Sequence, residues 1–120
     1  MKTFETHNDT SINANGTCLQ GYITAHYYQL VDIFGEPTES DGYKVDAEWY
    51  IEFEDGTVGT IYNWKNGPNY CGADGTPVEY ITEWNVGGKN GTSPVSDIGE
   101  VLNAKILYSQ IYKQDIFFFL

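Results

Sequence analysis

Residues able to do catalytic or metal chemistry are few in this chain of 120 residues. The two histidines are His7, near the start, and His26, in a predicted helix. Neither has partners at a spacing typical of a catalytic triad or a metal site. Glu48 and Glu52 could supply a glycosidase's paired carboxylates, but they fall on the open face of a predicted strand, where nothing withdraws them from water. We therefore expect a protein that binds without turnover, with no catalytic residue, no cofactor and no metal.

Lysines and aromatic side chains at predicted strand ends form a different kind of candidate site. Aromatic rings beside ammonium groups can stack a nucleobase and hold its phosphate. Gly87-Gly88-Lys89 follows a predicted strand and shortly precedes a predicted helix. In such a connection the backbone N–H groups and the N-terminus of the helix can both point toward a bound anion. The same glycines equally suit a plain connector, and the tryptophans equally suit a core. The candidate ligand-binding residues are Lys44, Trp64, Lys65, Trp84, Gly87, Gly88 and Lys89.

Acidic residues are the alternative candidate. They are dense between residues 32 and 55, where Lys44 is the single lysine, and the whole chain has a formal net charge of -11. Such a surface can attract a basic protein, although strands also carry charge simply to remain solvated and unpaired. The candidate partner-binding residues are Asp46, Glu48, Tyr50, Glu52 and Glu54.

The composition narrows the classes of partner. Arginine is absent, and 17 acidic residues stand against 6 lysines, so direct binding of nucleic acid is not expected. The longest apolar run, residues 116–120, is too short to span a bilayer, and the first residues do not form a signal peptide. We expect a cytosolic protein in which Cys18 and Cys71 are free thiols, because a disulfide would need an oxidising compartment.

A hairpin over residues 44–65 is predicted to organise the fold. Odd positions from Val45 to Phe53 are apolar and even ones polar, as in a strand with one buried face. Asp55-Gly56 suits a two-residue type I′ turn, which would place Glu54 opposite Thr57. That register puts one set of side chains from the second strand on the core face and pairs Asp46 with Lys65 across the strands. The predicted core-face set is Val58, Thr60, Tyr62 and Trp64.

The remaining segments complete a single α+β domain over residues 17–112. Residues 1–16 are predicted to be a loose arm or a poorly held first strand, and residues 113–120 an apolar tail. Between them we expect a strand at 17–23, a helix at 25–34 ended by Gly35, a strand at 78–86, and a helix at about 95–112 with Pro94 at its first position. The result is an antiparallel sheet with a central hairpin and two helices on one face.

Short motifs between residues 17 and 89 are similar to those of a family. On these motifs the chain resembles small acidic proteins of tailed bacteriophages. Members of that group often carry histidine where this chain has Asn85, so no acid–base or metal role is carried over to that position. The motifs are Leu19-Gln20-Gly21-Tyr22, Phe34-Gly35-Glu36-Pro37, Tyr43-Lys44, Glu48-Trp49, Phe53-Glu54-Asp55-Gly56-Thr57-Val58, Thr60-Ile61-Tyr62-Asn63-Trp64-Lys65 and Glu83-Trp84-Asn85-Val86-Gly87-Gly88.

The resemblance implies a counter-defence role in the host cytoplasm, by either of two routes. The chain would sequester a nucleotide-type immune signal, or it would act as an acidic inhibitor of a host defence protein, resembling an anti-CRISPR protein or a nucleic-acid mimic. A phage structural or accessory protein is a third alternative. A closed ligand pocket on so small a chain favours a homo-oligomer, which the apolar end Phe117-Phe118-Phe119-Leu120 would help to assemble.

Overall fold

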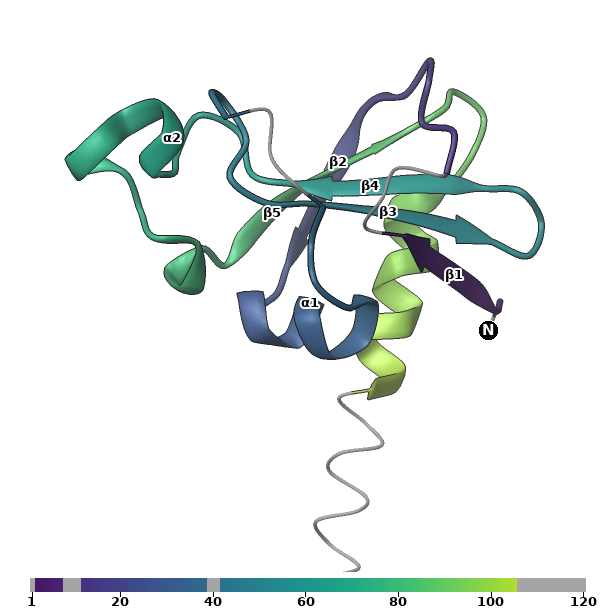
Figure 1. Ribbon diagram of the computed structural model, residues 1–120. Helices are drawn as coiled ribbons and strands as arrows, with labels where there is room; N and C mark the ends of the chain where they lie inside the picture. Colours follow the sequence, from purple (N-terminus) through teal and green to yellow (C-terminus); the bar gives the residue numbers. More distant parts are fainter. Residues whose placement is uncertain (1, 8–11, 39–41, 106–120) are drawn as a thin grey trace, which may run out of the picture.

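The protein is one α+β domain built on a five-stranded antiparallel sheet (Figure 1). The structure is a computed structural model, and it describes residues 2–7, 12–38 and 42–105. The strand order is β1-β3-β4-β5-β2, so the β3–β4 hairpin is central, as predicted. The strands are β1 (Phe4–His7), β2 (Cys18–Thr24), β3 (Glu48–Phe53), β4 (Val58–Tyr62) and β5 (Glu83–Gly88).

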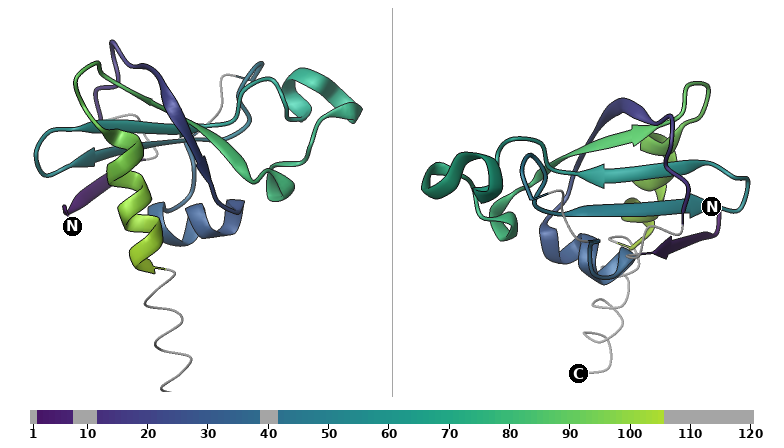
Figure 2. Two further views of the ribbon diagram at one scale, coloured as in Figure 1. Left: turned by 180° about the vertical axis from the view of Figure 1, so that it is seen from behind. Right: turned by 45° about the horizontal axis from the view of Figure 1, so that its top comes forward.

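Two helices cover one face of the sheet (Figures 1 and 2), which confirms the predicted layering. α1 (Tyr27–Phe34) starts later than expected, after His26, whose backbone N–H donates to Gln29 Oε1 at 2.8 Å. Gly35 ends it, with φ of +84°. The second helix begins at Pro94, where a missing N–H costs nothing, and its described part is residues 94–105. The predicted continuation to residue 112, the tail and Phe117-Phe118-Phe119-Leu120 lie outside the described residues.

The core between the sheet and the helices is built around two tryptophans. The rings of Trp49 and Trp84 meet edge to face, with centroids 5.4 Å apart. Each indole N–H donates to a carbonyl, Trp49 to Gly35 at 2.7 Å and Trp84 to Ala25 at 3.0 Å. Both tryptophans are therefore buried in the core, and the N–H group of each indole has a hydrogen-bond acceptor there. Aliphatic side chains complete it, among them Leu30, Ile51, Ile61, Val86, Ile98 and Val101.

The predicted register of the hairpin is wrong by one residue. Glu52, not Phe53, lies opposite Val58, because Phe53 N–H donates to the Thr57 carbonyl at 2.8 Å across a three-residue loop. Gly56 closes the loop with φ of +87°, as in a turn followed by a left-handed residue. A register shift of one residue moves every side chain of β4 to the opposite face of the sheet. Ile61 consequently points into the core, and the opposite, open face of the sheet takes Val58, Thr60 and Tyr62.

The third strand also differs from its prediction. β5 spans Glu83–Gly88, and the expected beginning of the strand is a short 3-10 helix, Val78–Tyr80, from which Tyr80 is 75% exposed. The long loop before it contains the short helices α2 (Pro68–Cys71) and η1 (Gly72–Asp74). Gly87 and Gly88 therefore belong to a buried strand and not to a connector.

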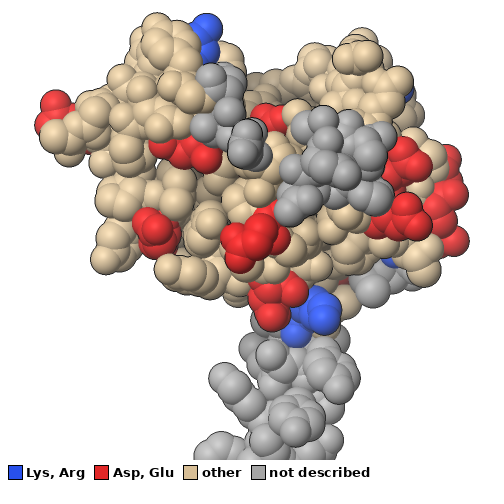
Figure 3. All heavy atoms as spheres, viewed as in Figure 1, with Lys and Arg blue, Asp and Glu red and all other residues tan. Residues whose placement is uncertain are grey.

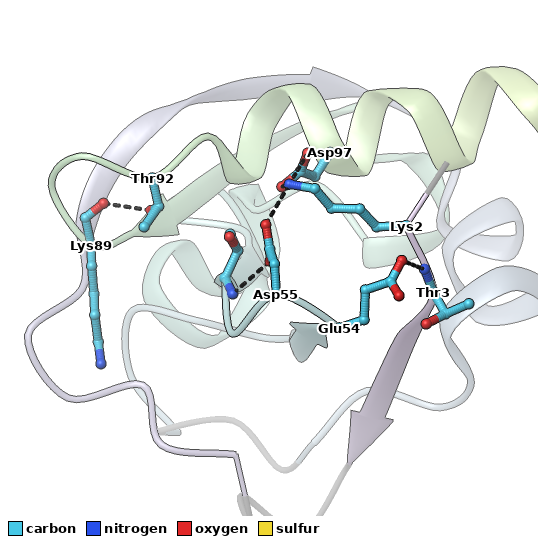
Figure 4. A network of polar contacts seen from close by, with 8 residues as sticks. Lys2, Thr3, Glu54, Asp55, Lys89, Thr92 and Asp97 are labelled. Atoms are coloured by element: carbon cyan, nitrogen blue, oxygen red, sulfur yellow. Dashed lines mark hydrogen bonds and ion pairs between the residues drawn. The ribbon is translucent and has the colours of Figure 1, made fainter.

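The N-terminal segment forms strand β1, the second of the two predicted alternatives. β1 pairs with β3 at one edge of the sheet, while β2 pairs with β5 at the opposite edge. Residues 14–18, which lead into β2, lie beside Tyr50, Thr60 and Tyr62 on the open face. Lys2 holds the start of β1: its ammonium lies 2.7 Å from Asp55 in the hairpin loop and 3.1 Å from Asp97 in the second helix (Figure 4).

Candidate functional site

The open face of the sheet contains a hollow of about 370 Å³. Its floor is made by β3, β4 and β5, and one wall is the segment of residues 14–18 that leads into β2. Trp64 and Val45 also line the hollow. The side chains and backbone of the floor come from Glu48, Tyr50, Thr60, Tyr62 and Gly87.

Gly87 keeps the floor of this hollow low. A Cβ atom at this position would lie 2.5 Å from Thr60 Oγ1, on the strand directly opposite, and 3.5 Å from the Tyr62 ring. No side chain fits there without moving its neighbours. Because Gly87 has no side chain, the floor is lower at this position than at the neighbouring Thr60 and Tyr62 side chains, and this contributes to the hollow.

The polar side chains that line the hollow include one carboxylate, Glu48, and two phenols, Tyr50 and Tyr62. Burial, and then a hydrogen bond donated to the Glu48 carboxylate, raise the pKa of Tyr50 to about 12. Burial likewise raises the pKa of Tyr62, although a hydrogen bond from the Asn85 side chain opposes the change. Both phenols remain protonated at neutral pH, and the Tyr50 hydroxyl already donates its one proton to the Glu48 carboxylate.

Trp64, which lines the hollow, also belongs to a closed ring of ammonium groups and aromatic side chains, which we name the lysine–aromatic cluster: Tyr43, Lys44, Trp64, Lys65 and Tyr70. Lys44 Nζ lies 5.5 Å from the Tyr43 ring centroid and 5.4 Å from that of Trp64. Lys65 Nζ lies 5.7 Å from Trp64 and 5.4 Å from Tyr70. Tyr43 and Tyr70 meet edge to face at 5.4 Å. Two cations thus share one indole that is 45% exposed.

The backbone that carries this cluster is held in an unusual conformation. Lys65 has φ of +58°, the left-handed region that a branched or long side chain rarely adopts. Its N–H donates to the Lys44 carbonyl at 2.8 Å, and its own carbonyl accepts from the Cys71 thiol at 3.2 Å. Conformations of this kind cost about 1 kcal/mol or more and persist where surrounding contacts enforce them, often at binding sites.

Asn63, which is fully buried, supplies much of that enforcement. Its Oδ1 accepts the backbone N–H groups of Asp46 and Ala47, at 2.8 and 3.1 Å. Its Nδ2 donates to Asp46 Oδ2 at 2.8 Å and to Asn66 Oδ1 at 3.0 Å. The residues before β3 and after β4 are therefore bound together at Asn63, which directly precedes Trp64 and Lys65 in the chain. Gly67 fits only as glycine, because a Cβ there would lie 2.0 Å from Asp46 Oδ2.

The predicted ligand-binding residues separate into groups. Lys44, Trp64 and Lys65 come together in the lysine–aromatic cluster, and Gly87 lines the same hollow as Trp64. Trp84 is wrong as a stacking surface, because it is fully buried in the core.

The structure separates the expected anion-binding corner from the lysine–aromatic cluster. Gly88 is a residue of β5 covered by Pro94, whose Cγ would lie 2.4 Å from a Cβ at this position. Lys89 follows β5 at the end of the sheet where β4 begins, whereas Trp64 follows the other end of β4. Figure 4 shows the Lys89 side chain extending away from the loop that leads into the second helix.

The predicted partner-binding residues are likewise divided. Glu48 and Tyr50 line the hollow. Asp46 does not pair with Lys65 but accepts from Asn63 and, at 3.0 Å, from the Asn69 N–H.

Glu52 and Glu54 are exposed toward the β1 edge. Glu54 accepts the Thr3 backbone N–H at 3.0 Å (Figure 4), and Glu52 lies directly opposite Glu5 on β1. Acidic side chains recur across the face drawn in Figure 3, where lysines are sparse.

Sequence reasoning missed Tyr43 and Tyr70 as members of the site. Tyr43 precedes the alternating pattern of the hairpin, and Tyr70 lies in a loop without periodicity, so neither could be assigned a face. The only signal was local: each tyrosine is close in sequence to a lysine already considered.

In the described ranges, no group of three histidine, cysteine, aspartate or glutamate side chains is placed to hold a metal ion. No helix within those ranges combines the length and apolar character needed to cross a membrane. Cys18 and Cys71 are exposed free thiols. Comparison of the chain with protein-family models, with curated proteins and with solved structures finds no match.

Proposed function

We propose that this protein binds a nucleotide-type small molecule without turning it over, with the base against Trp64 and the phosphate between Lys44 and Lys65. One observation carries the proposal: two ammonium groups lie within 6 Å of a single exposed indole, and that indole lines a hollow of about 370 Å³. The left-handed Lys65 supports it, because strain of this kind is retained where a site needs a particular placement.

Stacking and charge explain how such a ligand would bind. A base that stacks on Trp64 must displace an ammonium group from the ring, losing a contact worth about 0.5–1 kcal/mol and gaining a stack worth about 1–3 kcal/mol. The displaced ammonium then reaches the phosphate. The net charge of -11 opposes an anionic ligand at long range, but salt screens that field beyond about 8 Å, so the two lysines determine the local potential.

The biological role that fits this chemistry is sequestration of a nucleotide signal by a phage protein in the host cytoplasm, as the resemblance to acidic phage proteins implies. Sequestration needs affinity and not catalysis. That agrees with the two phenols of the hollow, which stay protonated at neutral pH.

A thermal-shift screen of the whole chain tests the proposal. The probes are mononucleotides, cyclic di- and trinucleotides and ADP-ribose, each followed by calorimetric titration where it raises the unfolding temperature. A ligand at about 100 times its Kd should add about 2.7 kcal/mol of stability. Trp64→Leu and the double substitution Lys44→Met with Lys65→Met should each weaken binding at least tenfold. Lys89→Met, a lysine removed at the opposite end of the sheet, should not. Failure of every probe to bind would refute the proposal.

A second candidate, an acidic inhibitor of a basic host protein, is favoured by one specific observation. Glu5 and Glu52 lie directly opposite each other across β1 and β3 and both are exposed, so this edge of the sheet presents acidic side chains to a basic partner. This candidate predicts a complex that weakens steeply with added salt and is lost with Glu52→Lys. A salt-independent complex would refute it.

A further inference from the structure

We propose that the outer edge of β1 is a docking site for an extended segment of a partner protein, rich in lysine or arginine, which pairs with β1 as an additional antiparallel strand. This inference rests on the second candidate of the proposed function and adds the way in which the basic partner binds. It follows from the direction of the backbone groups of β1, from the charge beside them, and from a hollow along the same edge.

The register of β1 directs the backbone groups of Phe4 and Thr6 away from the sheet. The Glu54 N–H donates to the Thr3 carbonyl at 2.9 Å, which makes these two residues a hydrogen-bonded pair. In an antiparallel ladder such pairs alternate with pairs that do not bond to each other, so Phe4 and Thr6 do not bond to β3. β1 is an outer strand, and no described strand lies on its other side (Figures 1 and 2).

The N–H and C=O groups of Phe4 and Thr6 therefore form an open strand edge. Within the described ranges, neither residue makes a further backbone hydrogen bond. A segment that binds there in an extended conformation satisfies these donors and acceptors together, which is the mode of recognition called β-strand addition. The four residues of β1 are enough to present both outward-facing residues to such a segment.

The charge beside this edge favours a basic segment. The carboxylates of Glu52 and Glu54 are exposed and belong to β3 and the residue that follows it, one strand away from the edge. Lys2, which precedes β1, is already paired with Asp55 and Asp97. Neighbouring strands are about 4.8 Å apart, so the added strand would lie about 10 Å from β3, a distance that a lysine or arginine side chain can shorten. A second copy of this chain, with a net charge of -11, would be repelled.

A hollow of about 430 Å³ along the same edge gives a basic side chain a place to lie. Glu52 and Glu54 line it, and no lysine of the described ranges does. Phe4 belongs both to this lining and to the open strand edge, so the two features adjoin. Backbone pairing thus supplies affinity, and the acidic hollow supplies the preference for basic side chains.

Fluorescence anisotropy of a labelled peptide of alternating lysine and valine, titrated with the whole chain, tests the inference. If the lysines lie on the face of Glu52, antiparallel pairing directs the valine N–H groups toward β1. N-methylation of the valines should therefore weaken binding at least about tenfold, whereas N-methylation of the lysines should change it less than about threefold. Equal effects of the two methylations, or no binding of the unmethylated peptide, would overturn the inference.

Variants of the protein provide a second test. Thr6→Pro removes an outward N–H and places the proline ring at the edge, while it leaves the β1–β3 hydrogen bonds in place. It should weaken peptide binding at least about tenfold with little change in Tm, and a large fall in Tm would contradict the outward direction of the Thr6 N–H. Glu52→Gln should weaken binding and reduce its dependence on salt. The matched control is Glu83→Gln, an exposed glutamate on β5, which should change neither.

The outcomes separate this inference from the proposals beneath it. Salt-sensitive peptide binding that N-methylation does not alter would overturn strand pairing while the acidic-inhibitor candidate stands. Nucleotide binding at the lysine–aromatic cluster is measured without the peptide, so its failure is seen independently. A dimer of the unaltered protein that Thr6→Pro dissociates would place a second copy at this edge and overturn the choice of a basic partner. Because the methylated peptides are tested on the unaltered protein, the inference is tested whether or not a variant folds.

Discussion

Replacing Asn63 with alanine should lower the free energy of unfolding more than most other single substitutions that leave the large apolar side chains in place. The variant removes the acceptor of two backbone N–H groups, those of Asp46 and the fully covered Ala47, and it removes a donor from the Asp46 carboxylate. A buried donor without a partner costs about 1–3 kcal/mol, and the half-exposed Asp46 N–H costs less because water reaches it. The expected loss is about 3 kcal/mol, or about 10 °C in Tm for a domain of this size.

Urea unfolding, followed by tryptophan fluorescence, measures this loss as a shift in midpoint at constant slope. Asn66→Ala is the matched control, because it removes only one hydrogen bond to Asn63 from an exposed side chain and should cost less than about 1 kcal/mol. If Asn63→Ala costs no more than Asn66→Ala, the hydrogen bonds of Asn63 do not hold the two chain segments together, and our account of how Lys65 is kept in place is wrong.

Three further predictions concern the hairpin, the floor of the hollow and the N-terminal ion pair. Gly56→Val should lower the free energy of unfolding by at least about 1 kcal/mol, since valine resists a φ of +87°; an unchanged urea midpoint would refute the left-handed turn. Gly87→Ala should cost about 1–3 kcal/mol through its clash with Thr60, and Thr60→Ala in the same chain should recover most of the loss, measured by the same unfolding curves. Hydrogen bonding to the Lys2 ammonium holds the pKa of Asp55 at about 2, so this pair stabilises the fold above pH 4 and the contribution disappears as pH falls through 2. Lys2→Met should therefore return the pKa of Asp55 toward 4 in an NMR titration, and the stability gap from the unaltered protein should close at low pH; a gap that persists at pH 1.5 would contradict this origin.

The first strand of the hairpin could be predicted from sequence because every inward position from Val45 to Phe53 is apolar. The second strand could not, for two physical reasons. Asp55-Gly56 satisfies both a two-residue turn and a three-residue loop with glycine in the left-handed position, so the turn leaves the register open. The inward positions of β4 include Gly59, which has no side chain, and the strand leads into Asn63, which is polar and buried, so the pattern favoured the wrong face.

The error in the predicted hairpin register also affected how the tryptophans were interpreted. The predicted register placed Trp64 on the core face together with Trp84, so either could be chosen as a stacking surface. In the observed register the side chains of β4 are reversed, and Trp64 lines the hollow while Trp84 remains in the core. The wall at residues 14–18 could not be predicted at all, because that stretch is polar and without periodicity, and its position depends on where β1 and β2 join the sheet.

The placement of β1 and β2 also has a consequence for how the chain folds as it is made. Phe4 pairs with Phe53 and Cys18 pairs with Gly88, so the two strands synthesised first are those that must wait longest for partners. Contacts between residues distant in sequence form slowly because the intervening loop must be closed first. We expect the β3–β4–β5 meander to assemble as a unit with both edges uncovered, and the N-terminal strands to seal those edges afterwards. During that interval the nascent sheet offers two unpaired strands to any neighbouring chain.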